Sequence, residues 1–248
     1  MMKKKTTCCV LLSFSRGIST RSRATFSERS IQELTSRRIP FFYDYLHPQP
    51  SHLLNLSLID LLPKTWFRPN EGSVPGTLPS VARPPRLAPG HHLVYFPPQV
   101  TLSQLLPDGT DILHTPGPPF NRCLWAGGRV RFKIADNLSL DGNRAVCIET
   151  IRNVSVTGQE GAEKIFVAIE RRIGTVGEEE GDSSVRSRIW KANEEDFGQA
   201  SVIENRNLVF MREKSQEQIG YDKEHFSDDS RVVKRMYYYS LTYIQDFR

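Results

Sequence analysis

Pro119-Phe-Asn-Arg-Cys-Leu-Trp-Ala-Gly-Gly-Arg-Val-Arg-Phe132 is the stretch that decides the fold. Trp125 and the pair Gly127 and Gly128 are followed by a run in which apolar and basic side chains alternate. A period of two is typical of a half-buried antiparallel strand, so we expect a strand over 129–135. Adjacent glycines allow a tight bend or a close approach to other backbone. From the residues alone, the simplest interpretation is a packed Trp125 and a turn into the strand.

Further strand patterns follow that run. The stretch 145–156 alternates, but Ile151 is out of phase with the valines on either side, which indicates a bulge midway. The stretches 164–170 and 202–212 complete an antiparallel meander separated by glycine-containing turns. Between them, 171–198 is rich in Gly and Glu and is predicted to be a long mobile insert. The periodicity permits either a sheet that wraps another segment or a partly open barrel.

The first hundred residues hold weaker signals. A short helix is expected over 27–38, with Ile31 and Leu34 on one face, and the leucine-rich 52–62 is read as a buried helix or extended segment. His91 and His92 open an apolar run predicted to be a strand. Neighbouring strand residues point to opposite faces, so we expect one histidine to be inward and satisfied and the other solvated, with no shared metal.

Three segments carry a resemblance to a known family. They are the run Arg122, Trp125, Ala126, Gly127, Gly128 with its flanks, and the stretches 89–96 and 106–111. Together they resemble the N-terminal half of fungal mitochondrial 3-hydroxyacyl-thioester dehydratases, which are MaoC-like double hot-dog hydratases, over about 43–212. The resemblance implies an α+β hot-dog, an antiparallel sheet wrapping a helix. This chain would be a single N-terminal half with a disordered leader and tail.

The chain divides into four expected regions. Residues 1–25 contain Arg, Lys, Ser and Thr but no acid, the composition of a transit peptide that directs import to the mitochondrial matrix. A secretory signal is the alternative, since a short apolar run follows the first lysines. Glycosylation of the sequons at Asn55, Asn137 and Asn153 would separate the two. An N-terminal helical segment at 26–68, a hot-dog half at 69–214 and an irregular tail at 215–248 follow.

Charge and cysteine content narrow the possible partners. Six of the 33 basic residues precede the first acid, Glu28, so the remaining 27 face 28 acidic residues, and no basic patch for nucleic acid is expected. No apolar run approaches the roughly 20 residues that span a bilayer. Cys8 and Cys9 lie in the leader, and Cys123 and Cys147 are expected to be small buried side chains. No motif for a metal or a cofactor is present, so neither is expected.

The resemblance implies the reversible dehydration of a 3-hydroxyacyl thioester to a trans-2-enoyl thioester in mitochondrial fatty acid synthesis. In that family the acid/base pair lies in the second hot-dog, in an Asn- and His-containing stretch that this sequence lacks, so no catalytic residue is assigned. Trp125, Gly127 and Gly128 are the substrate-binding candidates, for an acyl thioester carried on acyl carrier protein or CoA. The alternative is a non-catalytic hot-dog module that binds an acyl thioester or a partner subunit. A lone half exposes an edge and a face, so we expect a homo-oligomer.

The last residues suggest a further expectation. Four tyrosines fall within 235–243, and Arg-Met-Tyr can be encoded by codons that contain a fungal-type splice donor. We therefore expect the tail to be translated intron and the natural protein to continue into a catalytic hot-dog. The alternative is a real aromatic tail that covers the bare sheet.

Overall fold

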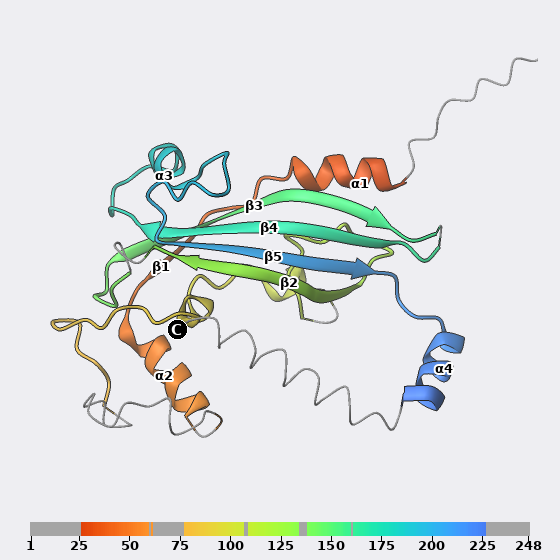
Figure 1. The fold of residues 1–248 in the computed structure, drawn as a ribbon, viewed down its shortest axis with the longest axis horizontal. Helices are drawn as coiled ribbons and strands as arrows, with labels where there is room; N and C mark the ends of the chain where they lie inside the picture. The colour runs from red at the N-terminus through yellow and green to blue at the C-terminus, as the bar shows by residue number, and fades with distance from the viewer. Residues whose placement is uncertain are drawn as a thin grey trace, which may run out of the picture.

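The sheet is the main element of the fold (Figure 1). The computed structural model describes residues 26–59, 61, 77–106, 109–133, 138–159 and 161–226. Five antiparallel strands lie in the order β1-β3-β4-β5-β2. Their bounds are β1 Phe42–Tyr45, β2 Arg122–Phe132, β3 Arg144–Thr157, β4 Lys164–Thr175 and β5 Val202–Met211. The three central strands form the predicted meander, and the α+β hot-dog arrangement is confirmed.

Short helices surround this sheet. The α-helices are α1 Phe26–Thr35, α2 Pro48–Leu58, α3 Asp182–Ile189 and α4 Gln216–Phe226, and the 3₁₀ turns are η2 His91–Val94 and η3 Leu102–Gln104. The chain between α2 and β2 is otherwise irregular where described, and of these two turns only η2 carries a buried residue, His92. α4 lies where the irregular tail was expected to begin. None of the described helices is long and apolar enough to cross a membrane.

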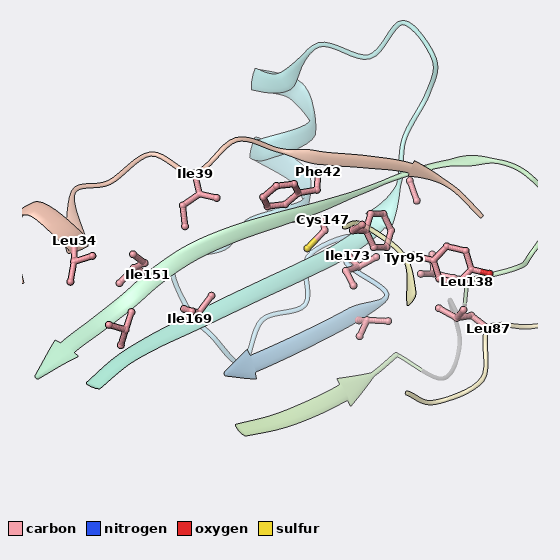
Figure 2. Close-up of a cluster of buried hydrophobic side chains, with 14 of the residues drawn as sticks. Leu34, Ile39, Phe42, Leu87, Tyr95, Leu138, Cys147, Ile151, Ile169 and Ile173 are labelled. Carbon is pink, nitrogen blue, oxygen red and sulfur yellow. The ribbon is translucent and has the colours of Figure 1, made fainter. Parts of the chain in front are cut away.

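Apolar side chains cluster on both faces of the sheet. The larger cluster defines what we call the inner face, where Leu34 of α1 and Phe42 of β1 gather with Ile151 and Ile169 (Figure 2). The smaller cluster defines the outer face and lies beneath α3. The predicted contact of Ile31 and Leu34 with the core is confirmed. Because β1 pairs with β3, the sheet begins within the region expected to be helical.

The bulge predicted in β3 is confirmed, since its register with β4 shifts between Ile151 and Asn153. Val146 and Val154 have the same phase along the sequence, yet Val146 packs on the outer face and Val154 on the inner face. The extra residue, Arg152, turns the second half of the strand over. The valines after the bulge, Val154 and Val156, therefore face the inner cluster instead of the outer one.

The edge strand β2 differs from its prediction. It begins at Arg122 rather than at residue 129, and Trp125 lies inside it, next to a bulge before Gly127. Trp125 is 67% exposed, so the expectation of a packed tryptophan is wrong. Both expected uses of the glycines occur: Gly127 has φ +121°, and a Cβ on Gly128 would lie 2.2 Å from the Asn205 carbonyl oxygen. Ile134 lies outside the described residues.

The segment 171–198 is ordered, so the prediction of a mobile insert is wrong. Its first residues complete β4, and α3 follows, with Val185 and Ile189 fully buried. The Gly and Glu content of this segment predicts a solvated loop. The eight-residue α3 nevertheless packs on the outer face, because its two buried apolar side chains are enough to anchor it.

A buried guanidinium holds the chain that follows α3. Arg172 is 0% exposed, and its Nε lies 2.6 Å from Oε1 of Glu170. Its terminal nitrogens donate to the backbone carbonyls of Asp196, Asn193 and Glu194 at 2.5, 3.1 and 3.3 Å. The periodicity of the sequence cannot report these contacts, because they are made to backbone atoms.

The leucine-rich stretch is helical but not buried. α2 ends at Leu58, and Leu53, Leu56 and Leu61 are 52%, 39% and 75% exposed. The expectation of a buried segment is therefore wrong for the described residues. Residues 60 and 62–76, which follow this helix in the sequence, lie outside the described residues.

Candidate functional site: a charged ladder beside an apolar cavity

Charged residues occupy the centre of the inner face. Glu149 of β3, Arg171 of β4 and Glu204 of β5 are paired in register across the three strands, and all three are buried. Arg171 Nε lies 2.6 Å from Glu149 Oε1, and its Nη1 lies 2.9 Å from Glu204 Oε2. We call this set the ladder. One guanidinium between two carboxylates leaves a negative charge that neighbouring groups must balance.

Those neighbours are basic. Arg206 Nε donates to Glu204 Oε1 at 2.6 Å, and His114 Nε2 lies 2.9 Å from Glu149 Oε2. Burial alone would raise the pKa of Glu204, but contact with His92 and the charges of Arg206 and Arg171 hold that pKa at about 2. The pKa of Glu149 is also lowered, since His114 and Arg171 more than offset its burial. Both carboxylates therefore stay ionised.

The loop that carries His114 is fixed from two sides. Arg37, just after α1, donates through Nη1 to the carbonyls of Leu113 and Thr115, both at 2.9 Å. Asp111 accepts a hydrogen bond from the Leu113 backbone N–H at 2.8 Å. The long-range contacts of Arg37 and the local contact of Asp111 together place the imidazole of His114 against the ladder.

His92 lies on the other side of the ladder. It belongs to η2 and not to a strand, so the strand expected here is wrong, and Gly90, with φ +86°, precedes the turn. His92 is 1% exposed, and its Nε2 lies 3.4 Å from Glu204 Oε2 without hydrogen-bond geometry. His91 is half-buried and bonded to Ser51 at 2.5 Å. One histidine is thus inward as expected, but it is not satisfied, and the other is not solvated.

A cavity of about 470 Å³ opens beside the ladder. Its wall is mostly apolar, and its polar end contains Glu149 and Arg171 together with His114, Arg206 and Asp111. The apolar lining includes Leu93, Tyr95, Phe96, Val100, Leu208 and Phe210. Such a cavity suits a ligand with a hydrocarbon part and an oxygen-bearing part.

One wall of the cavity is held in an uncommon conformation. Phe96 has φ +57°, in the left-handed region, although it is not glycine. Its ring is buried, its backbone N–H donates to Asp44 Oδ2 at 3.0 Å, and the Tyr95 hydroxyl donates to the His47 carbonyl at 2.6 Å. These hydrogen bonds, to Asp44 of β1 and to His47 just after β1, offset the backbone strain at Phe96, which is roughly 1–3 kcal/mol.

The candidates from the sequence lie elsewhere. Trp125 and Gly127 do not line this cavity, and Gly128 lines a separate hollow of about 360 Å³ beside Arg129 and Asn205. Their contact with a substrate stays a prediction. Cys147 is buried as expected, which raises its pKa to about 12, whereas Cys123 is half-buried and lines the cavity.

Sequence reasoning missed the ladder, although a signal was present. Arg171 has the same phase as the inward-facing Ile165, Val167 and Ile169, so the alternation already placed a charge inside. In β3, Glu149 likewise has the same phase as the buried Cys147 and Ile151. Within the described residues, no group of three His, Cys, Asp or Glu side chains is placed to hold a metal ion.

Comparison with known proteins identifies the family. No curated protein matches the chain significantly. The sequence model of the family described as hydroxyacyl-thioester dehydratase type 2 matches residues 90–243, more than half of the chain. The match begins later than the expected resemblance and ends later, running through the tyrosine-rich 235–243, so it lends no support to a translated intron. Assignment to the N-terminal half stays a prediction. Together with the hot-dog sheet, the match shows that this chain belongs to the hydroxyacyl-thioester dehydratase type 2 family.

Proposed function

We propose that the chain is the acyl-binding half of a 3-hydroxyacyl-thioester dehydratase of mitochondrial fatty acid synthesis. The observation that carries this proposal is the cavity of about 470 Å³ on the inner face, with its apolar wall and charged end. Its size falls within the roughly 300–1,000 Å³ of small-molecule sites. In a family that acts on acyl thioesters, a hydrocarbon chain is the natural occupant of the apolar wall.

Catalysis requires a second hot-dog, in the same polypeptide or in another. Residues 1–248 contain no Asn- and His-containing stretch of the kind that carries the acid/base pair in the family. We propose that the ladder belongs to binding, because Glu149 and Glu204 are ionised, buried and already paired with arginines. A carboxylate in this state is a poor proton donor.

The test measures binding and turnover on the same preparation. We expect the full chain to bind hexanoyl-CoA but to hydrate crotonyl-CoA no faster than buffer. Hydration well above background by protein of verified mass would contradict the assignment to a non-catalytic half. A failure to bind any acyl thioester would contradict the acyl-binding role.

A non-catalytic module that docks on a partner subunit is the second candidate. It is favoured by the exposure of Leu124 and Trp125 on β2, which is one of the two edge strands of the described sheet. Under this alternative, acyl thioesters do not bind, and a partner hot-dog pairs with β2.

We propose import into the mitochondrial matrix. Support comes from the six basic residues and the absence of acid before Glu28. A fusion of residues 1–35 to a fluorescent protein should reach mitochondria. A secretory or cytosolic signal from that fusion would contradict the proposal.

A further inference from the structure

The cavity on the inner face follows the register of the sheet. Every second residue of the last part of β5, namely Arg206, Leu208 and Phe210, lines the cavity. Arg206 is paired with Ile169 of β4, and Phe210 is paired with Cys123 of β2, and both partners line the cavity as well. The cavity therefore runs lengthwise along β5. The four-residue step from Arg206 to Phe210 spans about 13 Å in a strand.

The two ends of this run differ in polarity and in exposure. Arg206 lies next to the ladder, and its side chain is 31% exposed. Phe210, at the other end, is only 2% exposed. The wall between them is apolar and is formed by Leu208 and Ile169. A ligand with a polar head and a hydrocarbon tail therefore fits with its head beside the ladder and its tail directed toward Phe210.

The strand wall of the cavity ends at Phe210 and Cys123. Within the described residues, none after Phe210 lines the cavity, and Cys123 is the one residue of β2 that does. Arg212, two residues further along, is engaged elsewhere: its guanidinium lies 5.3 Å from the ring centroid of the buried Phe120, and its Nε donates to Glu163 at 2.8 Å. The chain beyond Phe210 is thus packed against its own partners. An acyl tail that reaches Phe210 has come to the end of the wall.

We propose that the cross-strand pair of Phe210 and Cys123 limits the length of the acyl chain that this hot-dog binds. The inference rests on the proposed acyl-binding function and adds a chain-length limit to it. An extended hydrocarbon chain of about ten carbons spans about 13 Å, the distance from Arg206 to Phe210 along β5. Decanoyl is therefore the expected limit. The pair would contact the far end of the tail and no reacting atom, so both residues determine specificity and neither is catalytic.

The experiment varies only the length of the tail. Calorimetric titration of the full chain uses saturated acyl-CoA thioesters from butanoyl to tetradecanoyl in two-carbon steps, each kept below the concentration at which it forms micelles. Every step that enters the cavity should tighten binding by about tenfold, because each buried methylene contributes about fourfold. Beyond decanoyl the gain per step should fall below about twofold, since the added carbons no longer find an apolar wall.

Two substitutions should move this limit in opposite directions. Phe210→Val shortens the side chain at the end of the wall and should move the limit one step longer, to dodecanoyl. Cys123→Leu adds bulk at the paired position and should move the limit one step shorter, to octanoyl. Phe42→Val is the matched control: Phe42 is 3% exposed and does not line the cavity, so this variant should lose stability and keep the native limit.

The outcomes separate this inference from the proposed function. Affinity that rises undiminished to tetradecanoyl, a native limit shorter than octanoyl, or a limit that neither Phe210→Val nor Cys123→Leu moves overturns the inference alone. If Phe210→Val does not fold, Cys123→Leu decides, and an unchanged limit in that variant overturns the inference. Binding of none of the thioesters overturns the proposed function with it.

Discussion

Single residues at the centre of the inner face combine burial with charge. Arg171 lies between two carboxylates, and the basic groups His114 and Arg206 stand at the two ends. Removing one member of such a set leaves another charge unpaired in the core, which costs about 3–5 kcal/mol. The ladder therefore has to be intact for the cavity beside it to keep its shape.

Acid should weaken the fold through Glu204. Its folded-state pKa is about 2, below the ordinary value of 4.5, so its stabilising contribution is present above about pH 4.5 and is lost as pH falls toward 2. Glu204→Gln should be less stable than the native chain at pH 6, and this gap should narrow by about 2–3 kcal/mol at pH 2. Urea unfolding of both proteins at pH 6 and at pH 2 measures this difference in the free energy of unfolding. Glu179→Gln, an exposed control, should show little gap at either pH, and a constant gap for Glu204→Gln would contradict the assignment.

Gly128 should not tolerate a side chain. A Cβ there would lie 2.2 Å from the Asn205 carbonyl oxygen, which is backbone of the paired strand β5 and cannot move aside. Gly128→Ala should lower the free energy of unfolding by about 1–3 kcal/mol. Gly177→Ala is the matched control, since its Cβ would be 3.7 Å from the nearest atom, Cβ of Glu180. Equal stability of the two variants would show that β2 can shift.

Elements with a strong period were predictable from sequence, and elements fixed by tertiary contacts were not. β3, its bulge and the first half of β4 follow from alternating apolar residues, and β5 follows from the apolar run 208–211. The stretch opening with His91 has strand-like composition, yet it forms a 3₁₀ turn after Gly90, and its buried His92 packs against Glu204 and Phe132. The candidate site was missed because charges interrupting an apolar phase were read as strand ends, as at Arg171.

The chain after α3 should depend on Arg172. Its guanidinium donates to Glu170 and to four backbone carbonyls, those of Ile189, Asn193, Glu194 and Asp196, so Arg172→Met should loosen residues 190–200 while the strands persist. Amide hydrogen exchange across that stretch should accelerate by about tenfold or more. Arg83→Met removes an exposed arginine that lies outside this stretch, and it should have little effect on the exchange of residues 190–200. Exchange that stays slow in Arg172→Met would assign the order to Val185 and Ile189 instead.

At the scale of the whole molecule, the described sheet has two edge strands, the short β1 and the long β2. Where the chain is described, β5 pairs with one side of β2 and no strand pairs with the other, and Leu124 and Trp125 are exposed beside it. An exposed edge with apolar residues favours association with another sheet. The edge is thus the natural place for a second hot-dog.

The purified chain should self-associate through this edge. Light scattering on a sizing column should give a mass above that of the monomer, and Leu124→Lys with Trp125→Lys should shift the protein to monomer. Leu53→Lys alters an equally exposed leucine on α2 and should leave the oligomer intact. A monomeric native chain, or an oligomer indifferent to the β2 substitutions, would contradict this prediction.

The ladder also determines which sheet this chain can assemble while it folds. Arg171 faces Glu149 in the native register, and the neighbouring inward positions of β3 are Cys147 and Ile151. A slip of two residues keeps every apolar side chain facing inward, so hydrophobic burial alone barely distinguishes it from the native sheet. In the slipped sheet, however, the guanidinium would face a thiol or an isoleucine, and a buried unpaired charge costs several kcal/mol. The same charges that border the cavity therefore reject misaligned strands before any ligand is bound.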